Sequence, residues 1–192
     1  MNHFNWDTSF LIDFDLKTGY STTAGTTKRY LSQMKDMFYD QDEALRILKN
    51  DDPLIYEFYE LGCPERAGAL SFGTTILHPG TIGDEYYMTK GHFHTILETA
   101  EVYYTLDVES YMVMENPEGD TIELPLETGK AIYVPRRYAH RSVNTGKVPL
   151  VIFYTFAGDA GHDYRTIETK GYRKLILKRE GRPAVVDNPR WN

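Results

Sequence analysis

The sequence contains a single cysteine, Cys63, so no disulfide can form within the chain. Long apolar runs are also missing, and no uncharged stretch approaches the length of a transmembrane helix. Residues 1–7 have neither the basic nor the apolar region of a secretory signal peptide. These absences predict a cytoplasmic protein without a membrane partner.

Positive charge is scarce as well. The formal net charge is −7 and the isoelectric point is about 5.4. A nucleic-acid-binding protein normally carries a basic surface, because neutralising phosphates supplies most of its affinity. The one local gathering of basic residues is typical of a solvated strand face, so no nucleic-acid partner is predicted. It consists of Lys174, Lys178, Arg179 and Arg182.

The 192 residues fit one domain with a sizeable core. Residues 1–52 have a mixed pattern, which predicts an extension packed on the main domain. A helix is expected over 41–50, because Asp40 can cap it and Glu43 lies three residues on, as in a capping box. The other expected segments are a short strand at 10–16, a loose stretch at 18–27 and a turn or short helix at 30–38.

Short β-like runs alternate with turn-forming residues over 53–192. Aromatic residues make up 14% of the chain, with 15 tyrosines, and they favour strands. Many short strands at this spacing predict an all-β sandwich or closed barrel. The expected strands are Leu54–Glu60, Ala69–Leu77, Tyr86–His94, Val102–Leu106, Ser110–Glu115, Thr121–Leu126, Lys130–Val134, His140–Val143, Leu150–Phe156 and Tyr172–Leu177.

Histidines and a carboxylate form a candidate metal site. In a strand, His92 and His94 would point to the same face, with Phe93 opposite. Such a pair is a weak signal alone, because surfaces and cores also contain it. Glu101 heads an aromatic run, where a carboxylate is costly unless paired or metal-bound, and His140 adds a third imidazole. Three neutral nitrogens and one carboxylate suit Fe, Mn, Ni, Zn or Co better than Mg or Ca.

Two strings carry a resemblance to a known family. Residues 89–94 read Thr-Lys-Gly-His-Phe-His, and residues 159–164 read Asp-Ala-Gly-His-Asp-Tyr. The spacing of the second cupin motif is found at Gly129, Pro135, His140 and Asn144. The sequence thus resembles the cupin-type glucose-6-phosphate isomerases. The resemblance implies a homodimer of all-β cupin barrels of the jelly-roll type, each with an N-terminal extension containing a short helix.

The resemblance also implies an activity, the interconversion of glucose 6-phosphate and fructose 6-phosphate in glycolysis and gluconeogenesis. One divalent metal, iron(II) with manganese, nickel or zinc as substitutes, would be held by His92, His94, Glu101 and His140. The phosphate would be contacted by Tyr56, Thr75, Thr89, Gly91, His162 and Tyr164. Arg137 stands where the family has a phosphate-contacting tyrosine, and arginine is a competent phosphate donor. Glu101 is the family's candidate base, and Tyr103 would share its face and could donate to a substrate oxygen.

Alternatives stay open. Arg137, and Phe156 at a position where the family can carry a tyrosine, are compatible with an isomerase or epimerase of another phosphosugar. A metal- or sugar-binding cupin without turnover is a second alternative, and an iron-dependent dioxygenase is a third. Within the isomerase hypothesis, an enediol and a hydride shift are both open, and Glu101 can be the base or only a ligand.

The backbone near residue 91 raises a question of geometry. In a regular strand, His92 and His94 share a face, while Thr89 and Gly91 point away from it. Thr89 can then reach a phosphate only through a distortion at Gly91 or by its main chain, and glycine permits such a distortion.

Overall fold

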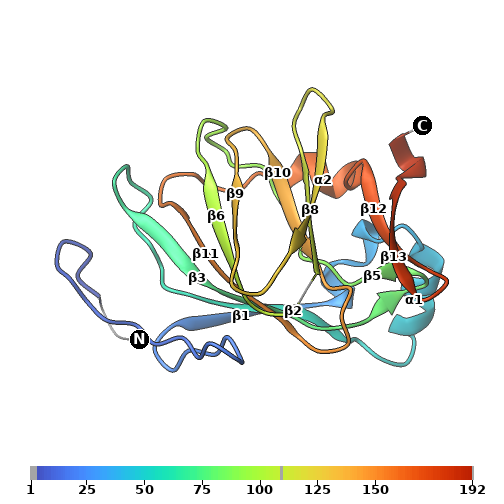
Figure 1. Ribbon diagram of the computed structural model, residues 1–192, viewed down its shortest axis with the longest axis horizontal. Coiled ribbons are helices and arrows are strands. Elements are labelled where there is room, and N and C mark those ends of the chain that lie inside the picture. The colour runs from blue at the N-terminus through green and yellow to red at the C-terminus, as the bar shows by residue number, and fades with distance from the viewer. Residues whose placement is uncertain (1–3, 109, 192) are drawn as a thin grey trace.

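The largest element of the computed structural model, which describes residues 4–108 and 110–191, is a six-stranded antiparallel sheet (Figure 1). The strand order is β1-β2-β3-β11-β6-β9, so that β11 lies between two strands that precede it in the sequence. The strands are β1 (Gly25–Tyr30), β2 (Leu54–Glu60), β3 (Leu70–Leu77), β6 (Glu101–Asp107), β9 (Ala131–Val134) and β11 (Leu150–Ala157).

Two smaller sheets complete the β structure. One has the order β10-β7-β8, and the other has the order β13-β12-β5-β4. Buried residues of β7, such as Met112 and Met114, belong to the same hydrophobic cluster as Leu77 and Ile152 of the large sheet, so the two sheets enclose a common core. The strands are β4 (Thr81–Ile82), β5 (Glu85–Tyr86), β7 (Ser110–Glu115), β8 (Thr121–Leu126), β10 (Ala139–Val143), β12 (Lys174–Arg179) and β13 (Arg182–Asp187). The prediction of an all-β cupin barrel is confirmed.

The predicted helix is present as α1 (Gln41–Leu48), and the Asp40 side chain accepts a hydrogen bond from the Glu43 amide at 2.9 Å. Two 3-10 turns, Leu31–Gln33 and Lys35–Met37, precede it, as the turn-or-short-helix prediction allowed. Together with β12 and β13, α1 lies at the side opposite the N-terminal arm (Figure 1). The division into an extension and a barrel at residue 52 stays a prediction, and β1 pairs with β2 across it.

The strand predicted at residues 10–16 is wrong, because this segment forms no strand pairing. Its aromatic residues pack on the outside of the large sheet instead, and the ring of Phe14 lies 6.0 Å from that of Phe153. The strand β1 lies partly in the stretch expected to be loose. Its sequence Gly-Thr-Thr-Lys-Arg-Tyr is polar and largely exposed, as is common in an edge strand, and carries no apolar alternation.

The strand predicted over residues 86–94 is also wrong. Only Glu85–Tyr86 is a strand, and isolated bridges join Met88 to Val143 and His92 to His140. The backbone is distorted at Gly91, where φ is +70°, as the question about Thr89 anticipated. A Cβ at this position would lie 2.5 Å from the Tyr172 hydroxyl, so glycine is required here. The helix α2 (Arg165–Lys170) and the strand β13 were not predicted.

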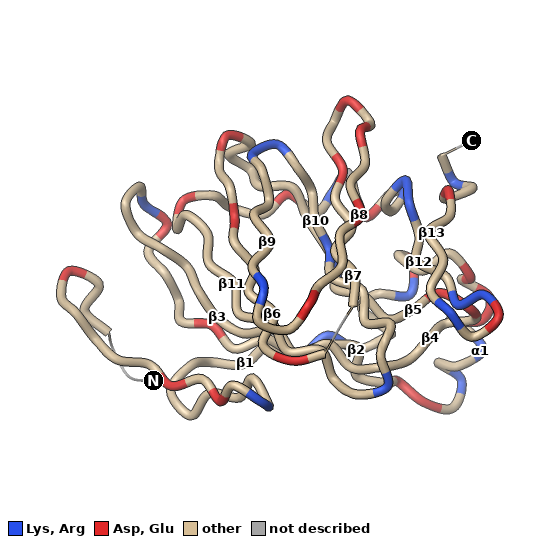
Figure 2. Tube along the Cα trace, in the orientation of Figure 1, with Lys and Arg blue, Asp and Glu red and all other residues tan. Residues whose placement is uncertain are grey.

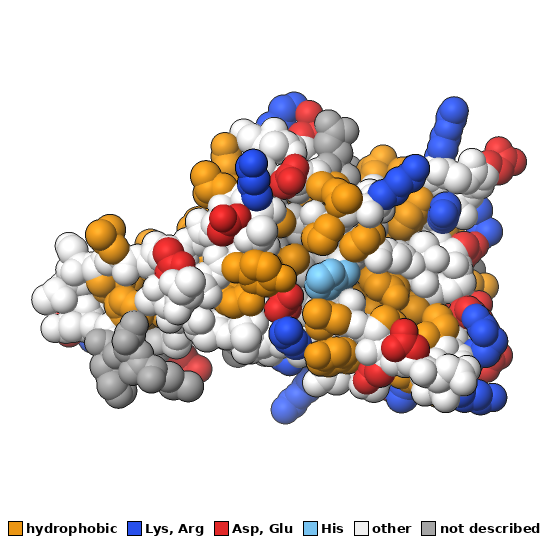
Figure 3. Space-filling model, turned by 90° about the horizontal axis from the view of Figure 1, so that it is seen from below, with side chains coloured by type: hydrophobic (Ala, Val, Ile, Leu, Met, Phe, Trp, Pro, Cys, Tyr) orange, Lys and Arg blue, Asp and Glu red, His pale blue; other side chains and the backbone are white. Residues whose placement is uncertain are grey.

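The surface shows no single sign of charge. Lysines and arginines are interspersed with acidic residues along the trace (Figure 2). Some large apolar side chains are exposed, including Leu11 and Tyr133, and hydrophobic groups surround a histidine on the face seen from below (Figure 3). Among the described helices, none has the length and apolar character needed to cross a membrane.

Asn144, the last position of the cupin-like spacing, forms hydrogen bonds with three backbone groups through its side chain. Its fully buried amide donates to the carbonyls of Leu77 at 2.8 Å and Val148 at 2.9 Å, and its Oδ1 accepts from the Gly146 amide at 2.8 Å. Replacing it removes these partners from buried backbone groups.

We therefore expect Asn144→Ala to lower the free energy of unfolding by about 2–4 kcal/mol, measured by urea denaturation. The control Asn50→Ala changes an exposed residue after α1 and should stay within about 0.5 kcal/mol of the wild type. Equal stability of Asn144→Ala and the control would contradict a structural role for Asn144.

Candidate metal centre and its cavity

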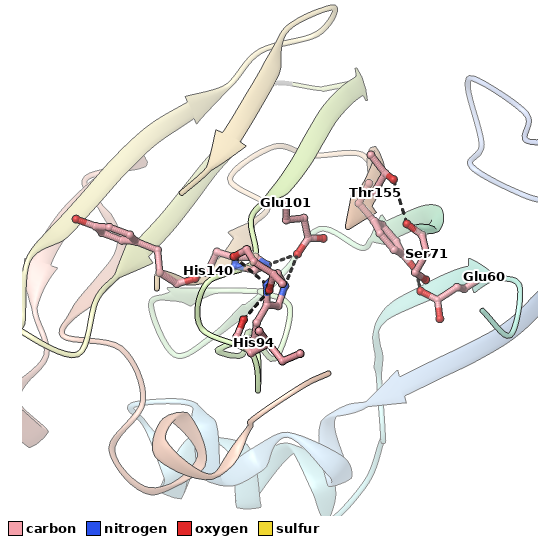
Figure 4. A network of polar contacts seen from close by, with 10 residues as sticks. Glu60, Ser71, His94, Glu101, His140 and Thr155 are labelled. Carbon is pink, nitrogen blue, oxygen red and sulfur yellow. Dashed lines mark hydrogen bonds and ion pairs between the residues drawn. The ribbon is translucent and has the colours of Figure 1, made fainter. Parts of the chain in front are cut away.

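Four side chains from separate parts of the chain converge at one point. Glu101 is the first residue of β6, His140 belongs to β10, and His92 and His94 come from the irregular segment beside β10. The potential ligand atoms of these four residues all lie within 4.8 Å of one another. Figure 4 shows His94 and His140 pointing toward the carboxylate of Glu101.

The second nitrogen of two imidazoles is held by a hydrogen bond. His94 Nδ1 lies 2.7 Å from the Thr99 hydroxyl, and His140 Nδ1 lies 3.2 Å from the Tyr138 carbonyl. Both Nε2 atoms face Glu101 Oε2, at 3.2 Å for His94 and 2.8 Å for His140. A hydrogen on Nδ1 leaves the Nε2 lone pair directed at the centre, which is the arrangement of metal-binding histidines.

The electrostatics favour a neutral His92 beside an ionised Glu101. Burial lowers the pKa of His92 well below its ordinary value, and the neighbouring His140 and His162 add to the effect. Burial alone would raise the pKa of Glu101, but the adjacent His140 and His94 side chains lower it below the usual range. Metal ligands must be in these protonation states.

The donor set fits a divalent transition metal. His92 Nε2 is buried and has no hydrogen-bond partner among the described residues, which is costly unless something else binds it. Three imidazole nitrogens and one carboxylate oxygen, within reach of one ion, match the preference of Fe, Mn, Ni, Zn and Co.

A cavity of about 270 Å³ opens beside this cluster, bounded by the inner face of the large sheet and by the segment 89–92. Its size is close to the lower end of the range for small-molecule sites. It is lined by Tyr56, Phe58, Glu60, Thr75, Thr89, Lys90, Gly91, His92, Glu101, Tyr103, His140, Ser142, Tyr154, Phe156, His162 and Tyr164.

The structure brings six of the seven residues of the expected phosphate contact set to this cavity: Tyr56, Thr75, Thr89, Gly91, His162 and Tyr164. Gly91 directly precedes His92 in the chain. The rings of His162 and Tyr164 lie 4.2 and 5.7 Å from that of His92, so these two side chains are at the metal end. The Thr89 hydroxyl accepts a hydrogen bond from the Ser142 amide at 3.0 Å and retains its own proton for a ligand.

The two candidate catalytic groups are adjacent. Tyr103 and Glu101 both line the cavity, and the ring of Tyr103 lies 5.4 Å from that of His140. Burial, together with the charge of Glu101 and a hydrogen bond to it, raises the pKa of Tyr103 well above its usual range. Tyr103 is therefore a neutral hydroxyl that can donate a hydrogen bond.

Arg137 does not join the predicted set. It is absent from the cavity lining among the described residues, and its guanidinium forms an ion pair with Glu118 instead. Its backbone has φ of +71°, in a turn between β9 and β10 that directs the side chain elsewhere. Phe156 does line the cavity, and its ring lies 5.8 Å from that of His94 and 5.3 Å from that of His162.

Sequence reasoning missed several residues at the cavity. Glu60 and Tyr154 line it and form a 2.8 Å hydrogen bond. Arg29 is not among the described lining residues but lies beside them: it is opposite Tyr56 in the pairing of β1 with β2, and its guanidinium carbon is 5.9 Å from the centre of the Phe58 ring. Of these residues, Glu60 could have been found from the sequence, because Tyr56, Phe58 and Glu60 alternate along one strand and therefore share a face.

The comparisons with known proteins agree with this geometry. The sequence model described as glucose-6-phosphate isomerase matches residues 28–190. The glucose-6-phosphate isomerase of Thermococcus gammatolerans is 43% identical over 95% of this chain and 96% of its own. That of Pyrococcus furiosus is 41% identical over 95% and 96%, and that of Sinorhizobium medicae is 34% identical over 92% and 85%.

Solved structures match less completely. An oxalate oxidase in complex with the substrate analogue glycolate is 15% identical, with a TM-score of 0.43, over 51% of this chain and 47% of its own. So partial a match supports no inference about function.

The hydrogen bond between Thr99 and His94 provides a test of the metal centre. We expect Thr99→Val to weaken divalent metal binding by about 10- to 100-fold, because His94 loses the partner that fixes its orientation. Titration with manganese or zinc after chelation measures the change. The matched control is Thr95→Val, whose hydroxyl is in the same loop and exposed. Equal affinities of the two variants would show that Thr99 does not orient a ligand.

Proposed function

Because the chain belongs to the glucose-6-phosphate isomerase family, we propose that it interconverts glucose 6-phosphate and fructose 6-phosphate with a divalent metal at the His92, His94, Glu101 and His140 cluster. The observation that carries the proposal is the opening of this cluster into one cavity that also contains Tyr56, Thr75 and Thr89. A single sugar phosphate could contact both groups of residues at once.

The carbonyl end of the sugar would lie at the cluster. A divalent metal held there would supply a Lewis acid that polarises the carbonyl and stabilises negative charge on its oxygen. Glu101 lines the cavity, so its carboxylate can reach a hydrogen on the carbon beside the carbonyl. Its lowered pKa keeps it ionised and able to accept a proton. Tyr103 stays protonated and can donate a hydrogen bond to a substrate oxygen.

The phosphate end would lie at Tyr56, Thr75 and Thr89, where Arg29 supplies positive charge. Burial raises the pKa of Tyr56 to about 12, and the nearby Arg29 guanidinium opposes this rise. Burial also raises the pKa of Tyr164, and the same guanidinium opposes this rise. Within the part of the chain that the structure describes, no carboxylate forms an ion pair with Arg29, whereas Lys90 is paired with Glu168. Arg29 is therefore the cation free to bind a phosphate.

The metal and the assembly are part of the proposal. Iron(II) is the resident metal by family resemblance, and the nitrogen-rich donor set is compatible with it, as with manganese, nickel and zinc. A homodimer is likewise proposed from the family. Metal analysis and a coupled isomerase assay on the same sample test the function directly. Absence of turnover in the iron- or manganese-loaded protein would refute it.

The role of Glu101 as a base has its own test. Glu101→Gln keeps the shape of the side chain but removes the proton acceptor, so we expect kcat to fall by about 10²- to 10⁴-fold with metal still bound. Metal content is measured on the same sample, because glutamine is a poorer ligand. Full activity of metal-loaded Glu101→Gln would show that Glu101 is only a ligand.

Arg29 predicts a separate effect on substrate binding. We expect Arg29→Gln to raise KM for fructose 6-phosphate at least tenfold, because a charged hydrogen bond to phosphate is lost. The KM of Arg29→Lys should lie between those of the wild type and Arg29→Gln. Steady-state kinetics of metal-loaded protein measure it. The control Arg46→Gln removes the same charge from α1, where Arg46 pairs with Glu43, and should leave KM within twofold. A KM for Arg29→Gln equal to that of the control would exclude the phosphate contact.

A further inference from the structure

The face of the large sheet that lines the cavity consists of rows of residues that lie opposite one another on neighbouring strands. One row contains the metal-ligand candidate Glu101, opposite Phe156 of β11. Residues of one face recur every second position, about 7 Å further along the strand. The next row, about 7 Å from the first, crosses β6, β11, β3 and β2 as Tyr103, Tyr154, Gly73 and Glu60.

Further along the same direction lie the residues assigned to the phosphate. The third row contains Thr75 of β3, opposite Phe58 of β2. The fourth contains Tyr56, opposite Arg29 of β1. The row of Tyr154 therefore lies between the metal end and the phosphate end of the cavity.

In this middle row, Tyr154 and Glu60 come from strands that are not neighbours, since β3 lies between them. The Tyr154 hydroxyl nevertheless donates a 2.8 Å hydrogen bond to Glu60 Oε2. The intervening residue is Gly73, and a Cβ there would lie 2.8 Å from the Tyr154 hydroxyl oxygen and would also clash with the Tyr59 carbonyl. The bond thus depends on a missing side chain at Gly73.

Glu60 is a carboxylate without a cationic partner. No lysine or arginine of the described chain forms an ion pair with it, although it lines the cavity beside Tyr154. Its protein partners are the Tyr154 hydroxyl and the side chain of Ser71, which lies beside it in Figure 4. Burial raises the pKa of Glu60. A partly buried carboxylate without a cation is costly unless ligands donate to it.

We propose that Glu60 and Tyr154 form a subsite that binds the middle hydroxyl groups of the sugar. An open-chain hexose phosphate has hydroxyls on the carbons between its carbonyl end and its phosphate, and the middle row lies at the corresponding place. Glu60 accepts hydrogen bonds from these hydroxyls, and the Tyr154 oxygen, whose proton is committed to Glu60, accepts another. The inference rests on the proposed function, because it takes the metal and phosphate ends from it.

Phe156 lines the cavity next to this subsite. A phenylalanine has no hydroxyl for the substrate, and Tyr154 lies two residues earlier on the same face, with its ring stacked 6.0 Å from that of Phe156. Tyr154 is 6.1 Å, ring to ring, from Tyr103, so substrate held by the pair lies against the candidate catalytic tyrosine.

The test measures KM for fructose 6-phosphate and the inhibition constant of inorganic phosphate, which probes the phosphate end alone. The variants are Tyr154→Phe, Glu60→Gln and the double variant, all metal-loaded. We expect each single variant to raise KM about three- to tenfold, and the double variant to be no worse than the two effects multiplied. The inhibition constant of phosphate should stay within twofold. The control is Tyr133→Phe, an exposed tyrosine of the same sheet.

Two results would overturn the subsite. One is a KM within twofold of the wild type in both Tyr154→Phe and Glu60→Gln. The other is a parallel rise in KM and in the inhibition constant of phosphate, which would show that the pair only maintains the shape of the cavity. If Glu60→Gln fails to fold, Tyr154→Phe decides alone, because it keeps the ring and its stacking.

Failure of the proposed function gives a different result. If the metal-loaded wild type does not isomerise fructose 6-phosphate, the activity is refuted, and calorimetric binding of fructose 6-phosphate and inorganic phosphate replaces the kinetic measurement. A loss of sugar phosphate affinity in Tyr154→Phe, with phosphate affinity unchanged, would then still support the subsite. Unchanged affinity for both would refute it.

Discussion

The burial of one carboxylate among three imidazoles is the constraint on which the site depends. Glu101 is 2% exposed, and its charge is tolerated because Oε2 lies within 3.2 Å of His94 and His140 nitrogens. Two of the histidines in turn are fixed through their other nitrogen, one by the Thr99 hydroxyl and one by a backbone carbonyl. Removing the Glu101 carboxylate would leave the lone pairs of the imidazoles buried and facing one another. Burying the carboxylate without the imidazoles would cost several kcal/mol. A divalent metal resolves both problems at once.

The convergence of these ligands also accounts for the irregular backbone around the cluster. His92 and His94 must approach β10 closely, and the bridge between His92 and His140 joins their irregular segment to that strand. The left-handed φ at Gly91 turns Thr89 and Lys90 so that both line the cavity beside the histidines. A regular strand would have hidden Thr89 on the other face. The same distortion therefore serves the metal end and the phosphate end.

Much of this could be predicted from the sequence, because local patterns determine it. The run of apolar and aromatic residues over 54–60 and the cap at Asp40 predicted β2 and the start of α1 closely. The ligand candidates were found because His92 and His94 alternate as on one face of a strand and Glu101 heads an aromatic run, where a carboxylate is costly unless paired or metal-bound. Residues 86–94 misled the prediction, because alternation there reflects ligands rather than strand pairing. Arg137 misled it because a positive φ in the turn directs its side chain to Glu118.

The pair of Glu60 and Tyr154 lay beyond any local pattern. The two residues are 94 positions apart, and their contact requires the register of three strands and the absence of a side chain at Gly73. No window of sequence contains that information. Motifs specify the chemistry at the reacting end, where ligand geometry leaves little freedom, whereas contacts along the rest of the substrate depend on which face and which row each strand presents.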